Sequence, residues 1–205
     1  MIVIDLEMSG MDILKCGIWQ IGAIDTDNPE NTFCEEARVE DEYEFILGET
    51  NTRKLFGKTE EELRAKNKQS EKQLLEHFFK WAEKSKSKNI VGHCVQYDFA
   101  FLQQKAFKYN LKFPFSHRIF DTHAIASVKY LDLNGRLLMK KDRLGFISDM
   151  GLKNVLKFVG MKDERIVHDA LGDSKLTAEA FSRLVYGKNL LKEYSSFKIP
   201  EYLIK

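Results

Sequence analysis

Two carboxylates inside an apolar stretch constrain the fold more than any other feature of this sequence. Residues 2–8 are Ile-Val-Ile-Asp-Leu-Glu-Met, which predicts a strand covered on both faces. Residues two apart in a strand project from the same face, so Asp5 and Glu7 point the same way. Burying two ionised carboxylates side by side is unfavourable without a cation, and the first basic residue is Lys15. For this pair alone a plain alternative stays open, in which the strand ends at Asp5 and water solvates Glu7.

Two further acids stand at the starts of expected helices. Asp98 begins a helix near residues 97–109, where a capping role is the more common interpretation. Asp173 precedes Leu176 by three residues, which places it on the inward, apolar stripe of a helix over 169–186. Four carboxylates brought together would repel one another unless a hard cation held them, and oxygen ligands favour Mg²⁺ or Mn²⁺. This hypothesis requires that none of the four acids is neutralised by lysine or arginine.

One histidine lies close to this acidic set in the sequence. His168 stands five residues before Asp173, in the approach to the last long helix. A neutral imidazole with a pKa of about 6.5 can take a proton from water at neutral pH, which a hydrolytic site requires. We therefore interpret His168 as a candidate general base, and the histidines at 77, 117 and 123 as structural or exposed.

The order of the expected elements gives the fold class. Apolar runs predict strands over 2–8 and 17–25, with a third strand that reaches Val39 nearer to an edge. Strands that then alternate with helices imply parallel crossovers. We therefore expect an α/β fold: a mixed β-sheet, an antiparallel meander followed by parallel strands, flanked by helices. The later elements are expected as helices that begin at Thr59 and that contain Leu74 to Ala82, strands at 89–92 and 118–120, and helices at 97–109, 122–130, 151–159 and 169–186.

The connection over residues 131–149 is too long for an ordinary loop of a compact domain. It contains Lys140, Lys141 and Arg143, which could follow a phosphate backbone. A basic loop of this length is more often simply solvated. The sequence leaves the role of this stretch open.

Composition bounds the size and charge of the protein. The chain has 205 residues, of which 43% are hydrophobic, so it can bury one proper core. We expect residues 1–187 to form one domain and residues 188–205 to form a C-terminal tail that packs on the domain or on a partner. The formal net charge of +1 excludes a general polycation, so any binding of phosphate must be local.

The expected environment follows from cysteines and apolar runs. The three cysteines at positions 16, 34 and 94 fit neither a disulfide framework nor a zinc site. The apolar runs are far shorter than the ~20 residues of a membrane helix, and the sequence opens without a basic and apolar leader. We therefore expect a cytoplasmic protein without membrane contact.

Three short segments, taken together, resemble the motifs of one enzyme family. They are Asp-Leu-Glu-Met-Ser-Gly at 5–10, His-Cys-Val-Gln-Tyr-Asp-Phe-Ala-Phe-Leu at 93–102, and His-Asp-Ala-Leu-Gly-Asp at 168–173, with Phe-Asp-Thr at 120–122 between them. In this order they resemble the DEDDh 3′-to-5′ exonucleases over roughly residues 1–187. The family more typically has Thr at the position of Met8, Asn at Cys94 and Phe at Tyr97, which puts the substrate preference in doubt but removes no acid.

The resemblance implies a fold, an activity and a site. The fold is ribonuclease H-like, and the activity is metal-dependent 3′-to-5′ exonuclease cleavage of phosphodiester bonds in single-stranded DNA or RNA, with release of nucleoside 5′-monophosphates. Two divalent cations, Mg²⁺ or Mn²⁺, would be bound by the four acids, and His168 would deprotonate the attacking water. The implied metal ligands are Asp5, Glu7, Asp98 and Asp173, and the implied substrate-binding residues are Met8, Ser9, Gly10, Met11, His93, Tyr97 and Phe99.

Two functions from other classes stay open at this point. The chain could be a catalytically degenerate family member that binds nucleic acid or accompanies a polymerase. The acids could instead form a structural cation site in a scaffold protein, in which His168 would have no role. The expected partners are the 3′ ends of single-stranded nucleic acid, with a homodimer through the tail or a polymerase or repair complex as further possibilities.

Overall fold

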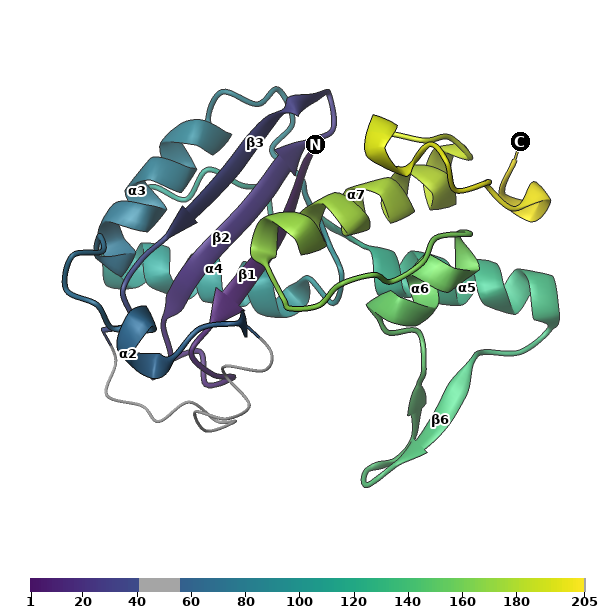
Figure 1. The fold of residues 1–205 in the computed structure, drawn as a ribbon, viewed down its shortest axis with the longest axis horizontal. Coiled ribbons are helices and arrows are strands. Elements are labelled where there is room, and N and C mark those ends of the chain that lie inside the picture. The colour runs from purple at the N-terminus through teal and green to yellow at the C-terminus, as the bar shows by residue number, and fades with distance from the viewer. Residues whose placement is uncertain (41–55, 205) are drawn as a thin grey trace.

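The computed structural model describes residues 1–40 and 56–204, and its centre is a five-stranded sheet in the order β3-β2-β1-β4-β5 (Figure 1). Strands β1, β2 and β3 pair antiparallel, whereas β1 and β4, and then β4 and β5, pair parallel. The predicted α/β fold with a mixed sheet is therefore confirmed. The strands are β1 (Ile2–Met8), β2 (Ile18–Asp25), β3 (Asn28–Glu36), β4 (Ile90–Gly92) and β5 (Ile119–Asp121).

Helices cover both faces of the sheet. Helices α3 and α4 lie behind it in Figure 1, and α7 crosses its front. No helix in the described part of the chain is both long enough and apolar enough to cross a bilayer. The helices are α2 (Glu60–Leu63), α3 (Glu71–Ala82), α4 (Gln96–Lys108), α5 (Thr122–Asn134), α6 (Leu152–Phe158) and α7 (Ala170–Tyr186), followed by the short 3₁₀ turns η1 (Lys192–Tyr194) and η2 (Glu201–Leu203).

The alternation of β1 decides which side of the sheet receives its acids. Ile4 belongs to the core that contains Phe78 of α3, whereas Val3 belongs to the core that contains Phe181 of α7. Because side chains alternate along a strand, Asp5 points to the same face as Val3, and Glu7 follows it. Both acids therefore lie on the face that α7 covers.

The start of α7 packs directly against the backbone of β2. A Cβ atom on Gly22 would lie 2.1 Å from the carbonyl carbon of Ala170, so only glycine permits this approach. The Ser174 hydroxyl donates to the Gly22 carbonyl over 2.7 Å, which fixes the first turn of the helix. Asp173 lies in this first part of α7, so its position depends on the glycine at residue 22 of β2.

We expect Gly22→Ala to destabilise the protein by about 2–4 kcal/mol, because the added methyl group meets backbone that cannot rotate away. For a chain of this size that loss lowers the melting temperature by about 5–15 °C. The matched control is Gly151→Ala, since a Cβ atom at Gly151 meets no atom within 4 Å. Thermal melts of both variants make the measurement. Equal melting temperatures would show that α7 does not need this contact.

The prediction of a long loop over 131–149 is wrong. Helix α5 continues to Asn134 and ends at Gly135, which has a left-handed φ of 68°. The next residues form an antiparallel hairpin of β6 (Met139–Asp142) and β7 (Gly145–Ser148), which projects from the body in Figure 1. Periodicity does not reveal the hairpin because its strands are short. All of β6 is exposed and β7 is mostly half-buried, so neither has the buried alternation that marks a longer strand.

Residues 188–204 pack on the body of the protein. Leu191 and Leu203 are buried, and the backbone carbonyls of Tyr194 and Phe197 accept hydrogen bonds from Arg183 of α7. Arg183 is fully buried and also pairs with Glu179 over 2.7 Å. The division of the chain at residue 187 stays a prediction.

Candidate active site

A cavity of about 490 Å³ opens where the end of β1 meets the start of α7. Its lining combines acids, a histidine and basic side chains from segments far apart in the sequence. The lining residues are Asp5, Leu6, Glu7, His93, Lys140, Asp149, Gly151, Leu152, Lys153, Asn154, Arg165, His168 and Asp173. Three of the four predicted acids and the predicted base therefore share one cavity.

The fourth acid, Asp98, lies against the strand that carries the first two. It is the third residue of α4, and its Oδ1 accepts a hydrogen bond from the backbone N–H of Leu6 over 3.0 Å. The turn before α4 is held by Asp121, whose carboxylate accepts from the backbone N–H of Val95 over 2.9 Å. Asp98 therefore contacts the backbone of Leu6, the residue between Asp5 and Glu7. All four acids thus lie at the same end of the sheet.

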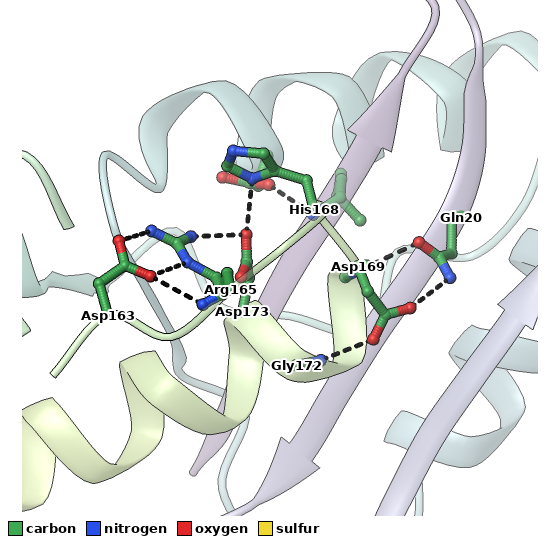
Figure 2. A network of polar contacts seen from close by, with 10 residues as sticks. Gln20, Asp163, Arg165, His168, Asp169, Gly172 and Asp173 are labelled. Carbon is green, nitrogen blue, oxygen red and sulfur yellow. Dashed lines mark hydrogen bonds and ion pairs between the residues drawn. The ribbon is translucent and has the colours of Figure 1, made fainter. Parts of the chain in front are cut away.

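Gln20 of β2 ties the start of α7 to the sheet (Figure 2). Its side chain donates to Asp169 Oδ1 over 2.9 Å and accepts from the Ala170 N–H over 3.1 Å. Asp169 caps the helix through its other oxygen, which accepts from the Gly172 N–H. This arrangement fixes the backbone one turn before Asp173 and directs that side chain toward β1.

Asp173 is the most highly connected acid of the site. Its Oδ2 lies 2.9 Å from His168 Nδ1 and 3.0 Å from Arg165 Nη1, as Figure 2 shows. Its Oδ1 is buried and has no hydrogen-bond partner among the described residues. A buried carboxylate oxygen without a donor is unfavourable and is the kind of atom that a cation would satisfy.

Burial and mutual repulsion weaken the acidity of the cluster. Burial raises the pKa of Asp5 well above its usual range, and the neighbouring Asp98 raises it further. Burial also raises the pKa of Glu7 to about 8 and that of Asp98 to about 7. These carboxyl groups therefore hold protons near neutral pH unless a positive charge joins them.

The residues fit a divalent cation that prefers oxygen ligands. Donor atoms of Glu7, His168 and Asp173 lie within 4.8 Å of one another, and Oδ1 of Asp173 is open to a further contact. The negative charges of Asp98, Glu7 and Asp173 each raise the pKa of Asp5, so its carboxyl group belongs to the same cluster. Carboxylate oxygens predominate, as Mg²⁺ and Mn²⁺ sites require.

The expectation that none of the four acids has a basic partner is wrong, because Asp173 has one. Arg165, which the sequence reasoning missed, forms an ion pair with it over 3.0 Å. Arg165 also pairs with Asp163 over 2.7 Å, so it cannot neutralise the four acids of the cluster. The signal for it is the Asp-Glu-Arg run at 163–165, three residues before His168, which carries no periodicity that would fix the direction of a side chain.

His168 and His93 differ in their proton affinity. Hydrogen bonding to Asp173 raises the pKa of His168, whose side chain is 45% exposed. Burial lowers the pKa of His93 to about 4, and its Nδ1 lies 3.0 Å from the Thr122 hydroxyl. His93 is therefore neutral at physiological pH, whereas His168 holds its proton more tightly than a free imidazole while it is paired with Asp173.

Of the seven predicted substrate-binding residues, His93 alone lines this cavity in the described part of the chain. Met11 and Tyr97 are exposed, by 52% and 43%, and Phe99 packs edge to face on Phe113. Ser9 is buried and its hydroxyl accepts from the Gly17 N–H. Met8 packs partly against the core, and Gly10 is half-buried between Ser9 and Met11. Their contact with substrate stays a prediction.

Comparisons with known proteins agree with this fold. A family model described as an exonuclease family, RNase T, matches residues 2–181. Among solved structures, E. coli exonuclease I with a dT13 oligonucleotide has a TM-score of 0.65 and 18% identity, over 89% of this chain and 40% of that chain. The zinc ion bound form of the E. coli exonuclease I complex with ssDNA has a TM-score of 0.65 and 20% identity, over 91% and 40%.

The nuclease domain of 3′hExo, a DEDDh family member bound to rAMP, has a TM-score of 0.64 and 18% identity, over 98% of this chain and 95% of that chain. At such identities the likeness establishes the fold, which is the predicted ribonuclease H-like arrangement. The chain spans about 40% of the exonuclease I chain. No curated protein sequence matches it.

Proposed function

Because the chain belongs to the exonuclease family whose model matches residues 2–181, we propose that it removes nucleotides from the 3′ end of a single strand of nucleic acid. The membership confirms the resemblance drawn from the three motifs. The observation that carries the proposal is the convergence of Asp5, Glu7 and Asp173 with His168 around one cavity, with Asp98 bound behind it. The products would be nucleoside 5′-monophosphates and a shortened strand.

Solved structures of similar fold support this class of substrate. E. coli exonuclease I was solved with dT13 and with dA16 oligonucleotides, and the 3′hExo nuclease domain with rAMP. Both deoxyribose and ribose ligands occur among these neighbours, so they favour a single-stranded end and leave DNA and RNA as alternatives. The near-zero net charge agrees with recognition of a short end.

The site residues would divide the reaction between them. The four acids would hold two divalent cations, Mg²⁺ or Mn²⁺, which when bound supply polarisation of the attacking water and stabilisation of the leaving 3′ oxygen. His168 would accept one proton from that water as it attacks the terminal phosphorus. The bond between phosphorus and the 3′ oxygen breaks, and the 3′ oxygen leaves as a hydroxyl after it takes up a proton.

We propose that exposed side chains of the motif segments and of the β6 and β7 hairpin contact the substrate. Met11 and Tyr97 present apolar surface to solvent, which suits contact with a base. Lys140 lines the cavity at the base of the β6 and β7 hairpin, and Lys141 and Arg143 follow it outward. We propose that these basic residues follow the phosphates on the 5′ side of the terminal nucleotide.

One observation favours a second function. Arg165 pairs with Asp173, as it would in a degenerate protein that binds nucleic acid without cutting it. The retained Glu7, Asp98 and His168 argue for the enzyme, because a protein that only binds a strand has no need for buried acids of raised pKa. Sensitivity of cleavage to a chelator separates the two functions.

The deciding experiment is digestion of 5′-labelled DNA and RNA, single-stranded and double-stranded, with Mg²⁺ or Mn²⁺. We expect a ladder of labelled products that shorten from the 3′ end, faster on single strands, and no products in EDTA. A circular single strand is the control, since it has no 3′ end. Cleavage of the circle at the same rate would make the protein an endonuclease, and absence of any cleavage would favour the binding protein.

A further inference from the structure

Arg165 has one edge occupied and the other directed into the site (Figure 2). Its Nε and Nη2 donate to the two oxygens of Asp163 over 2.8 and 2.7 Å, which is a bidentate fork. Its Nη1 donates to Asp173 Oδ2 over 3.0 Å. The side chain is only 18% exposed and lines the cavity. The guanidinium group is therefore anchored by Asp163 whether or not it contacts Asp173.

The contact with Asp173 is the one that a cation would challenge. Arg165 and His168 donate to the same oxygen, Oδ2. A divalent cation bound to this carboxylate would lie close to the guanidinium charge and compete with both donors. A cation on either oxygen of Asp173 would thus weaken the contacts of the candidate base and of the arginine edge with Oδ2 together.

We propose that Arg165 is a phosphate-binding residue of the site, whose Nη1 edge contacts either Asp173 or the phosphate of the terminal nucleotide. This proposal rests on the proposed function. Guanidinium edges bind phosphate oxygens through paired, charge-assisted hydrogen bonds, and the Asp163 fork presents the remaining edge in a fixed direction. Arg165 would hold Asp173 until a cation takes it and would then orient the phosphate that is to be attacked.

Opposite shifts in cation affinity test the competition. Titration calorimetry with Mn²⁺ alone should give Arg165→Met a dissociation constant about tenfold lower than the wild type, because a competing positive charge is gone. Asp163→Asn should raise that constant, because its arginine is left to bind Asp173 more strongly. If Arg165 and Asp163 had only a structural role, both variants would shift the Mn²⁺ dissociation constant in the same direction. Arg136→Met, at an exposed position outside the site, is the matched control and should match the wild type.

Titration with deoxyadenosine 5′-monophosphate at saturating Mg²⁺ tests the phosphate contact. Arg165→Met should bind this nucleotide about tenfold more weakly or worse, since a charge-assisted hydrogen bond is lost. Arg165→Lys keeps the charge but not the fork, so it should stay near the wild type for Mn²⁺ and lose part of the nucleotide affinity. Arg165→Lys and Asp163→Asn also keep the test decisive if Arg165→Met does not fold.

The outcomes distinguish failure of the Arg165 proposal from failure of the proposed exonuclease function. Unchanged Mn²⁺ affinity in Arg165→Met, shifts in one direction for both variants, or unchanged nucleotide affinity would overturn the role of Arg165. If the wild type then still binds Mn²⁺ and digests strands, the proposed exonuclease stands. A wild type that neither binds Mn²⁺ nor digests any strand overturns the exonuclease and Arg165 with it.

Discussion

Replacement of His168 by alanine is expected to lower the rate of terminal nucleotide release by about 10²–10⁴-fold at saturating Mg²⁺. The reason is the loss of the group that would accept the proton of the attacking water. His168 is half-exposed and its ring hydrogen-bonds to Asp173 at the edge of the cavity, so the fold should remain intact without it. Rates are measured by quench-flow on a 5′-labelled strand, with the Mg²⁺ concentration raised until the rate no longer changes.

Two controls show whether the loss is chemical. His117→Ala removes an exposed histidine outside the site and should keep the wild-type rate. Binding of a labelled strand by His168→Ala, measured in Ca²⁺, should match that of the wild type. A rate within about threefold of the wild type at saturating Mg²⁺, well short of the loss expected for a general base, would exclude His168 as the base. Loss of folding would reduce it to a structural residue.

Replacement of Asp5 by asparagine is expected to abolish the rise in melting temperature on addition of Mg²⁺ and to lower the rate by at least about 10²–10³-fold. Asp5 is the acid whose pKa is raised by all three other acids of the cluster. Removal of its charge weakens any cation site there and relieves repulsion in EDTA. The melting temperature in EDTA should therefore increase while the response to Mg²⁺ disappears.

The pH dependence in EDTA gives a second readout of the same cluster. A carboxyl group with a raised pKa binds its proton more tightly in the folded protein than in the unfolded chain, so stability falls as pH rises between the two pKa values. For Glu7 this window runs from about 4.3 to about 8. The wild type should lose stability across it, and Asp5→Asn should lose less.

Asp132→Asn, at an exposed position on α5, is the control for both measurements and should behave as the wild type does. A normal Mg²⁺ response in Asp5→Asn would show that Asp5 is not among the cation ligands. Stability that rises with pH in EDTA would show that the acids are not repelling one another.

Two of the acids were predictable because each conflicts with its own local pattern, whereas Asp98 at the start of a helix does not. Asp5 interrupts an apolar strand, and Asp173 lies on the apolar stripe of a helix, so each position is unfavourable unless the site requires it. The antiparallel start of the sheet and its parallel continuation were predicted from the apolar runs and from the helices that alternate with the later strands. The sequence could therefore predict that these two acids serve a site, whereas the face of the sheet that receives Asp5 follows from the packing of α7 on it.

The partners of these acids were not predictable in the same way. Asp163 and Arg165 lie in the connection between α6 and α7, where no periodicity fixes the direction of a side chain. Gln20 looked like one more residue of a buried strand, and only the close approach of α7 gives its amide a role. Contacts of this kind depend on how two elements meet, which a local pattern does not contain.

Helix α7 is held in place at both of its ends, at its start by β2 and near its end by residues of the C-terminal segment. Asp173 lies near its beginning, and Arg183, near its end, is held by residues that follow it in the chain. During synthesis the contacts at the end of α7 cannot form until residues 190–197 have left the ribosome. The strand with Asp5 emerges long before then, so we expect a nascent chain to lack nuclease activity until residues 190–197 have been made.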